Sequence, residues 1–143
     1  MGEFKHSLDK KNRLFIPSNF RKKSFQQRFK SFILTRGLDG CLYLYDPKTF
    51  INISDKFKNL PVADKMEERA FKRLLLSGAT EVVPDSQGRI LIPHHLVDHA
   101  VLKEEVVILG VWDRIELWEE SRWRKYKQYA DKTFNNIASK LEI

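Results

Sequence analysis

The sequence predicts an α+β domain in which two related halves share one hydrophobic core. A motif occurs twice, at residues 9–17 (DKKNRLFIP) and 85–93 (DSQGRILIP), which is the mark of an internal repeat. Around both copies, short alternating apolar segments typical of strands are followed by longer segments with helical spacing. The chain has 143 residues, too few for each copy to bury a core of its own. We therefore expect one domain with a pseudo-twofold axis between the copies.

Each copy is expected to begin with a strand, a tight turn and a second strand. Residues 4–8 alternate between apolar and polar side chains, as in a half-buried strand. Asp9 is the first residue of the first turn, where its carboxylate can accept hydrogen bonds from backbone N–H groups. Asn12, and Gly88 in the second copy, are residue types that tolerate a positive φ. The proline at the end of each motif stops the second strand because it has no N–H to donate, and a short helical segment follows.

A hairpin and a helix are expected next in each copy. The paired hairpin strands are Ile33–Leu34 and Ile108–Leu109, then Leu42–Tyr45 and Ile115–Trp118. Asp46 followed by Pro47 predicts one helix start, and Asp64 predicts another helix that Gly78 ends. A stripe on this second helix (Met66, Ala70, Leu74) and a seam on the last one (Trp123, Tyr126, Ala130, Phe134, Ile137, Leu141) should pack mainly in the core. The terminal helix can also pack on a neighbouring subunit.

These elements divide the single domain, residues 1–143, into four parts. The first repeat is expected at 1–60, a connecting helix at 61–78, the second repeat at 79–123 and a C-terminal helix at 124–143. The longest apolar run, 106–112, is far shorter than the roughly 20 residues that span a bilayer. The chain has one cysteine and no apolar signal segment at its start, so we expect a cytoplasmic protein without membrane association.

The charge of the chain is concentrated at its N-terminal end. The formal net charge is +7, yet residues 1–36 contain ten lysines and arginines and only two acidic residues, Glu3 and Asp9. This asymmetry favours a polyanionic partner, with nucleic acid ahead of an anionic membrane.

The repeated turn carries the candidate binding residues. In the first copy Lys10, Lys11 and Arg13 lie on a short loop next to Lys5 on the preceding strand. The second copy keeps Arg89 but has neutral residues in place of the lysines. A rigid turn that presents arginine suits bidentate recognition of guanine or phosphate. We expect the first turn to be the stronger DNA contact.

The paired motifs, with GLDGCLYLY after the first and IELW after the second, resemble the bacterial MraZ family from about Phe4 to Trp123. The resemblance implies a β-barrel of two AbrB-like swapped-hairpin repeats with flanking helices. It also implies a transcriptional regulator, associated with the nucleoid, that binds direct repeats in double-stranded DNA ahead of the division and cell-wall gene cluster. A ring-shaped homo-oligomer is implied as well.

The resemblance places DNA contacts at Lys11, Asn12 and Arg13, with Arg89 from the second copy. One departure from the family pattern is Asn12, where glycine is more common. Asparagine can adopt the same backbone conformation but adds a side chain that can donate to a base or a phosphate. We expect the turn geometry to survive this change.

Two alternative functions compete with DNA binding. One is a metal-dependent enzyme: His95 and His99, one helical turn apart, could bind a metal with His94 or Asp98, but the matching segment of the first copy has no histidine. RNA binding is the other alternative, because Phe25, Phe29 or Phe32 could stack on single-stranded bases if exposed. The lone Cys41 is expected to be a buried thiol rather than a nucleophile. We expect no enzyme activity, cofactor, metal or small-molecule substrate.

Overall fold

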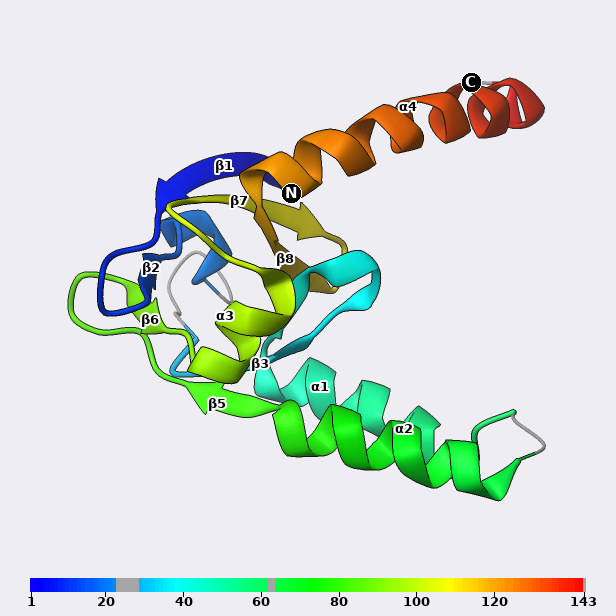
Figure 1. Cartoon of the computed structure of the whole chain (residues 1–143), viewed down its shortest axis with the longest axis horizontal. Helices are drawn as coiled ribbons and strands as arrows, with labels where there is room; N and C mark the ends of the chain where they lie inside the picture. The colour runs from blue at the N-terminus through cyan, green and yellow to red at the C-terminus, as the bar shows by residue number, and fades with distance from the viewer. Residues whose placement is uncertain (23–28, 62–63, 143) are drawn as a thin grey trace.

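The computed structural model describes residues 1–22, 29–61 and 64–142, and in these ranges it is α+β, as predicted (Figure 1). Its strands are β1 (Gly2–Ser7), β2 (Arg13–Phe15), β3 (Phe32–Arg36), β4 (Leu42–Tyr45), β5 (Thr80–Val82), β6 (Arg89–Leu91), β7 (Glu105–Val111) and β8 (Arg114–Glu119). Its helices are α1 (Pro47–Asp55), α2 (Lys65–Gly78), α3 (His94–Ala100) and α4 (Glu120–Leu141). Short 3-10 turns follow β2, β3 and α1, as η1 (Ser18–Phe20), η2 (Leu38–Gly40) and η3 (Lys56–Asn59).

The strand order shows the two halves directly. Six strands form one antiparallel sheet in the order β1-β7-β8-β4-β3-β5, and β2 pairs with β6 in a separate two-stranded ribbon. Exchanging β1 with β5, β3 with β7 and β4 with β8 turns this order into its own reverse. The first strand of each half pairs with the hairpin of the other half, since β1 lies on β7 and β5 lies on β3. The two repeats are therefore interleaved around a pseudo-twofold axis.

The expected β-barrel is wrong as a closed structure. The six-stranded sheet is open, with β1 and β5 at its edges. Closure would require the ribbon strands to continue the ladder, but β2 and β6 are each three residues long and pair with each other. Pro17 and Pro93 lie two residues beyond the ends of these strands and are the N-cap residues of η1 and α3 instead. The result is a sheet and a ribbon rather than a barrel.

Two helices begin at the N-cap residues that the sequence predicts. Asp46 accepts a hydrogen bond from the backbone N–H of Thr49 at the start of α1, and Pro47 is the first helical residue. The Asp64 carboxylate accepts from the N–H groups of Met66 and Glu67 at the start of α2. The C-terminal helix begins at Glu120, ahead of the boundary expected at 124.

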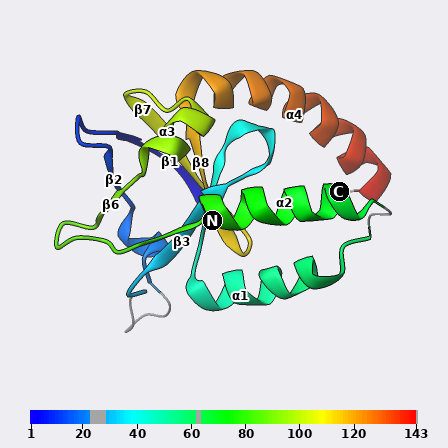
Figure 2. The same ribbon diagram turned by 60° about the horizontal axis from the view of Figure 1, so that its bottom comes forward.

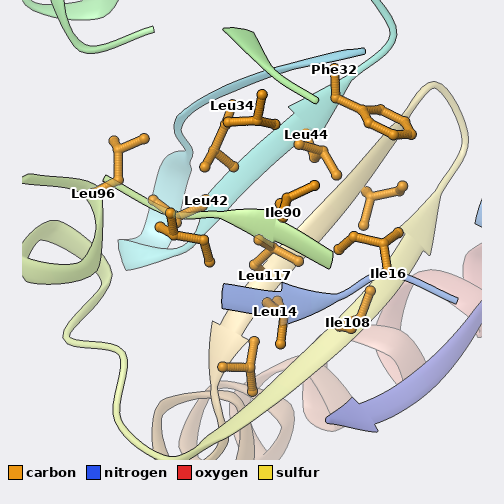
Figure 3. Packing of buried hydrophobic residues seen from close by; sticks show 14 of the residues in the cluster. Leu14, Ile16, Phe32, Leu34, Leu42, Leu44, Ile90, Leu96, Ile108 and Leu117 are labelled. Atoms are coloured by element: carbon orange, nitrogen blue, oxygen red, sulfur yellow. The ribbon is translucent and has the colours of Figure 1, made fainter. Parts of the chain in front are cut away.

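The core lies between the ribbon and the sheet (Figure 3). Leu14 of β2 and Ile90 of β6 are opposite each other in the ribbon and have no exposed surface. They belong to one buried cluster with sheet residues such as Leu34 and Leu117, and α3 adds Leu96. The outer face of the ribbon is thereby held in place by packing on its inner face.

The helices contribute less to the core than their apolar faces predicted. In α2 the described buried residues are Glu68 and Gly78, whereas Met66 and Leu74 are exposed. The seam of α4 is half-buried at Trp123 and Tyr126, which pack near Trp118 of β8, but Phe134 and later seam residues are exposed. The apolar spacing correctly identified the helices, but in the described part of the chain many of the side chains on their apolar faces are exposed to solvent.

The elements are distributed unequally between the two ends of the molecule. The β1–β2 and β5–β6 turns project from one end, at the left of Figures 1 and 2, and α1, α2 and α4 extend from the other. No helix in the described part of the chain has the length and hydrophobicity needed to cross a membrane. The candidate binding turns are thus separated from the exposed helices.

Candidate nucleic-acid interface

The first repeated turn is closed by the Asp9 carboxylate. Its Oδ1 accepts hydrogen bonds from the backbone N–H groups of Lys11 and Arg13, both at 2.9 Å. Its Oδ2 accepts from Nε of Arg13 at 2.7 Å. The backbone N–H of Asn12 donates to the Asp9 carbonyl, and Asn12 has the expected positive φ of 60°. One side chain therefore fixes both the loop and the arginine that the loop presents.

The second turn repeats this arrangement bond for bond. Oδ1 of Asp85 accepts from the backbone N–H groups of Gln87 and Arg89, and Oδ2 accepts from Nε of Arg89, all at 2.9 Å. Gly88 takes the place of Asn12, with φ of 80° and a 2.9 Å hydrogen bond to the Asp85 carbonyl. Two turns with different sequences thus hold an arginine in the same way.

The electrostatics of the turns favour the ionised carboxylates. The pKa of Asp9 is lowered chiefly by the hydrogen bond from the Arg13 backbone N–H, with the Arg13 guanidinium adding to the effect against an opposing contribution from burial. The pKa of Asp85 is lowered in the same way by Arg89. Both carboxylates are therefore charged at neutral pH and keep their arginines paired.

Each arginine keeps its terminal guanidinium nitrogens available. The guanidinium groups of Arg13 and Arg89 are engaged through Nε, and within the described residues neither guanidinium has another hydrogen bond or ion pair. Their side chains remain 34% and 28% exposed. An arginine held at Nε presents the planar pair of N–H groups that matches the O6 and N7 acceptors of guanine or two phosphate oxygens.

The two turns are joined through the ribbon. The N–H of Ile16, just after β2, donates to the Gly88 carbonyl at 3.0 Å, and the N–H of Ile92, just after β6, donates to the Asn12 carbonyl at 2.8 Å. Each turn is therefore hydrogen-bonded to the residue that follows the ribbon strand of the other half. Because β2 and β6 are antiparallel, the turns lie at opposite ends of the ribbon. Arg13 and Arg89 stand on its outer face, diagonal to each other. The structure therefore brings both predicted arginines onto one surface.

The predicted lysines divide into two groups. Lys10 and Lys11 are exposed on the first turn, beside Arg13. Lys5 lies on β1, and its Nζ is 3.2 Å from Oε1 of Glu120 at the start of α4. The structure thus places the first two lysines with the arginines and gives Lys5 an acidic partner at the base of the C-terminal helix.

Sequence reasoning missed the role of Arg21. Its Nε donates to the Ile16 carbonyl at 2.6 Å, and its guanidinium lies 5.5 Å from the centre of the Phe15 ring. A Cβ added at Gly88 would be 2.7 Å from its Cζ, so this guanidinium covers the second turn. The equivalent position of the other half is Val97. That mismatch between the copies is the signal that could have drawn attention to Arg21.

The histidines of α3 do not form a metal site in the structure. Within the described residues no three His, Cys, Asp or Glu side chains are grouped so that they could hold a metal ion. Nε2 of His95 instead lies 3.1 Å from the Gly78 carbonyl. Burial, and then the positive charge of Arg36, lower the pKa of His99. These surroundings remove the geometric basis for His94, His95 and His99 as joint ligands.

Of the remaining candidate residues, Phe29, Phe32 and Cys41 take part in packing. Phe32 is 1% exposed in the core, and the half-buried Phe29 packs against it with ring centres 5.5 Å apart. Phe25 lies outside the described residues. Cys41 is 1% exposed, and burial raises the pKa of its thiol to about 12, as expected for a structural cysteine. Stacking on RNA bases would require Phe32 to leave the core.

Comparison with known proteins gives a consistent family match in both halves. The family described as "MraZ protein, putative antitoxin-like" matches residues 1–74 and again residues 75–141. The two matches meet within α2, between the two repeats seen in the sheet.

Full-length relatives are similar to nearly the whole chain. A protein from Natranaerobius thermophilus named "Transcriptional regulator MraZ" is 43% identical over 141 residues, covering 99% of this chain and 95% of the relative. Proteins of the same name from Heliobacterium modesticaldum and Acetivibrio thermocellus are 42% and 43% identical, with 99% of this chain covered and 95% and 96% of theirs.

Proposed function

This chain belongs to the MraZ family, and we propose that it is a transcriptional regulator that binds double-stranded DNA sequence-specifically. Its relatives bear the name of a transcriptional regulator. The observation that carries the proposal is the matched pair of turns, each of which holds one arginine at Nε and leaves its terminal nitrogens without a partner among the described residues. A two-stranded ribbon is also narrow enough to enter the major groove.

The proposed target is a set of direct repeats ahead of the division and cell-wall gene cluster, bound by an AbrB-like homo-oligomer in the form of a ring. One pair of turns offers few cationic contacts and would bind weakly at physiological salt. Several linked subunits would place successive turns on successive repeats and gain affinity through multivalency. The exposed apolar side chains of α2 and α4 supply surface for such contacts between subunits. The protein would act in the cytoplasm, on the nucleoid.

The proposal is tested by titrating a labelled duplex from the DNA upstream of the protein's own gene. A scrambled duplex of the same composition is titrated in parallel at several salt concentrations. We expect tighter binding to the native duplex and a steep loss of affinity with salt, because phosphate contacts release counterions. Equal and weak binding to both duplexes would contradict a sequence-specific role.

Arginine variants identify the surface responsible. Arg13→Ala should weaken binding to the native duplex about tenfold or more, since a good bidentate contact is worth about 1–3 kcal/mol. Arg89→Ala should cost less, because the lysines flank only the first turn. The matched control is Arg124→Ala, which removes a 69% exposed arginine that is paired with Glu120 on α4. Unchanged binding by Arg13→Ala, with the fold intact, would exclude the ribbon as the contact surface.

A further inference from the structure

The outer face of the ribbon carries two apolar side chains as well as the two arginines. Leu14 and Ile90 point into the core, so Arg13, Phe15, Arg89 and Leu91 share the opposite face. Leu91 is directly across the ribbon from Arg13. Side chains in directly opposed positions lie within about 4.5–5.5 Å of each other at Cβ. An apolar group therefore stands next to the more strongly basic turn.

The two apolar side chains, Phe15 and Leu91, differ in their exposure to solvent. Phe15 is half-buried, because the His6 ring contacts it edge-on at 4.8 Å and Arg21 lies over it at 5.5 Å. Leu91, the equivalent residue of the second half, is 59% exposed. A leucine opposite an arginine gains no stabilisation from its exposure to water in the free protein.

The chemistry of the DNA major groove gives such a leucine a partner. Each thymine presents a C5-methyl group there, and this methyl is the one apolar feature among the donor and acceptor groups of the base edges. Arg13, the residue proposed above to contact guanine, lies directly across the ribbon from Leu91. The separation of opposed Cβ atoms in a ribbon, about 4.5–5.5 Å, exceeds the roughly 3.4 Å rise between neighbouring base pairs by about 1–2 Å, which the two flexible side chains can span. Arginine and leucine can therefore address adjacent base pairs.

We propose that Leu91 is a specificity-determining residue that packs on the C5-methyl of a thymine next to the base pair contacted by Arg13. This inference rests on the proposed DNA-binding function and adds the kind of base that the ribbon selects. It predicts that a thymine adjoins each guanine recognised by the first turn.

The test removes the methyl group from the DNA and the side chain from the protein. The duplex from the gene's upstream region is synthesised with either dTTP or dUTP, which changes each thymine to uracil without altering base pairing. Dissociation constants for both duplexes are measured with the wild-type protein, with Leu91→Ala and with Leu91→Met. Leu38→Ala is the matched control, because Leu38 is a 71% exposed leucine in η2, away from the ribbon. A thermal melt verifies that each variant is folded.

The wild-type protein and Leu38→Ala should bind the uracil duplex about fourfold more weakly for each methyl that is contacted, the value expected for one buried methyl-sized group. Leu91→Ala should bind the thymine duplex more weakly by a similar factor and lose most of its discrimination, while Leu91→Met should retain it. Discrimination by Leu91→Ala equal to that of the wild type would overturn the inference and leave the proposed function standing. Binding of the native duplex no tighter than that of a scrambled one would overturn both.

Discussion

At the scale of single residues, the aspartates of the two turns have a role beyond capping. In each turn one carboxylate oxygen closes the backbone turn and the other holds an arginine. Asp9 holds Arg13, and Asp85 holds Arg89. Fixing the guanidinium before DNA arrives reduces the side-chain entropy lost on binding. An acidic residue in the middle of a cationic surface is therefore expected to strengthen binding, although its charge opposes that of the phosphates.

Asp9→Asn separates these two effects. The amide oxygen can still accept from the backbone N–H groups, but its NH₂ cannot accept from Nε of Arg13, so the arginine is released. We expect affinity for the native duplex to fall about three- to tenfold, as for one side chain that is no longer preorganised. Anisotropy titration measures this, with circular dichroism to verify the fold. An increase in affinity would show that the negative charge outweighs positioning.

The glycine and asparagine of the two turns should not be interchangeable. Both residues adopt a positive φ, which asparagine tolerates. A side chain at position 88, however, would displace the Arg21 guanidinium, whose Nε donates to the Ile16 carbonyl, whereas the counterpart of Arg21 near the first turn is Val97. We expect Gly88→Asn to lower the free energy of unfolding by about 1 kcal/mol. Chemical denaturation checks this value.

The reverse exchange is the control for the glycine prediction. Asn12→Gly keeps the turn geometry and should change the free energy of unfolding by less than Gly88→Asn does, since it introduces no contact with a neighbouring side chain. Equal losses for the two variants would mean that backbone conformation, not the covering arginine, determines the residue at these positions.

At the scale of elements, the sequence predicted where helices begin better than what covers them. Asp46 and Asp64 cap helices as expected, because capping depends on residues a few positions apart. The stripe on α2 was expected in the core, yet Met66 and Leu74 are exposed. Hydrophobic spacing identifies the apolar face of a helix but carries no information on which surface it meets. That depends on the three-dimensional arrangement of the helices.

The reactivity of the Cys41 thiol reports on the packing of the N-terminal end of α4. The thiol lies in a cluster with Val107, Leu109 and Trp118, against which Trp123 and Tyr126 of α4 pack. With its pKa raised to about 12 by burial, the thiol has almost no thiolate at neutral pH. We expect the native protein to react with Ellman's reagent far more slowly than the unfolded chain.

Loosening α4 should expose this thiol before the domain unfolds. Tyr126→Ala removes a ring that lies 4.9 Å from Trp118, so the reaction of Cys41 should become at least several times faster in the folded protein. Tyr129→Ala, which removes a 63% exposed ring of the same helix, is the control and should have little effect. A rate unchanged by Tyr126→Ala would show that Cys41 becomes accessible only on global unfolding.

At the scale of the whole molecule, the repeat predicted the symmetry of the sheet but not that the sheet is open. Matched segments in the two copies predicted two equivalent halves, and the strand order is its own reverse when they are exchanged. Interleaving of the halves and a barrel came only from the family resemblance, and the barrel was wrong. Whether β2 and β6 join the larger sheet depends on long-range hydrogen bonds that no local pattern specifies. The positions of Arg13 and Arg89 on one surface follow from that same pairing.

The candidate binding turns and the exposed helices lie at opposite ends of the molecule. Phe134 and Ile137 on the distal half of α4 are 65% and 48% exposed. Apolar side chains grouped along an extended helix indicate a contact with another molecule. If that molecule is a second copy, Phe134→Glu should leave each subunit folded but dissociate the oligomer. Light scattering after size-exclusion chromatography would then show a lower mass.

DNA affinity distinguishes an assembly that matters for function from one that does not. Phe134→Glu leaves both turns intact, so a dissociated subunit should keep weak binding to DNA and lose about 10²-fold or more of the affinity that linked subunits provide. Asn135→Glu is the matched control, because it introduces the same charge one residue away and off the apolar seam. Both effects should be absent in this control. If Phe134→Glu lowers the mass and leaves the affinity unchanged, one subunit is sufficient for binding, and the regulator does not need a ring to recognise repeated DNA sites.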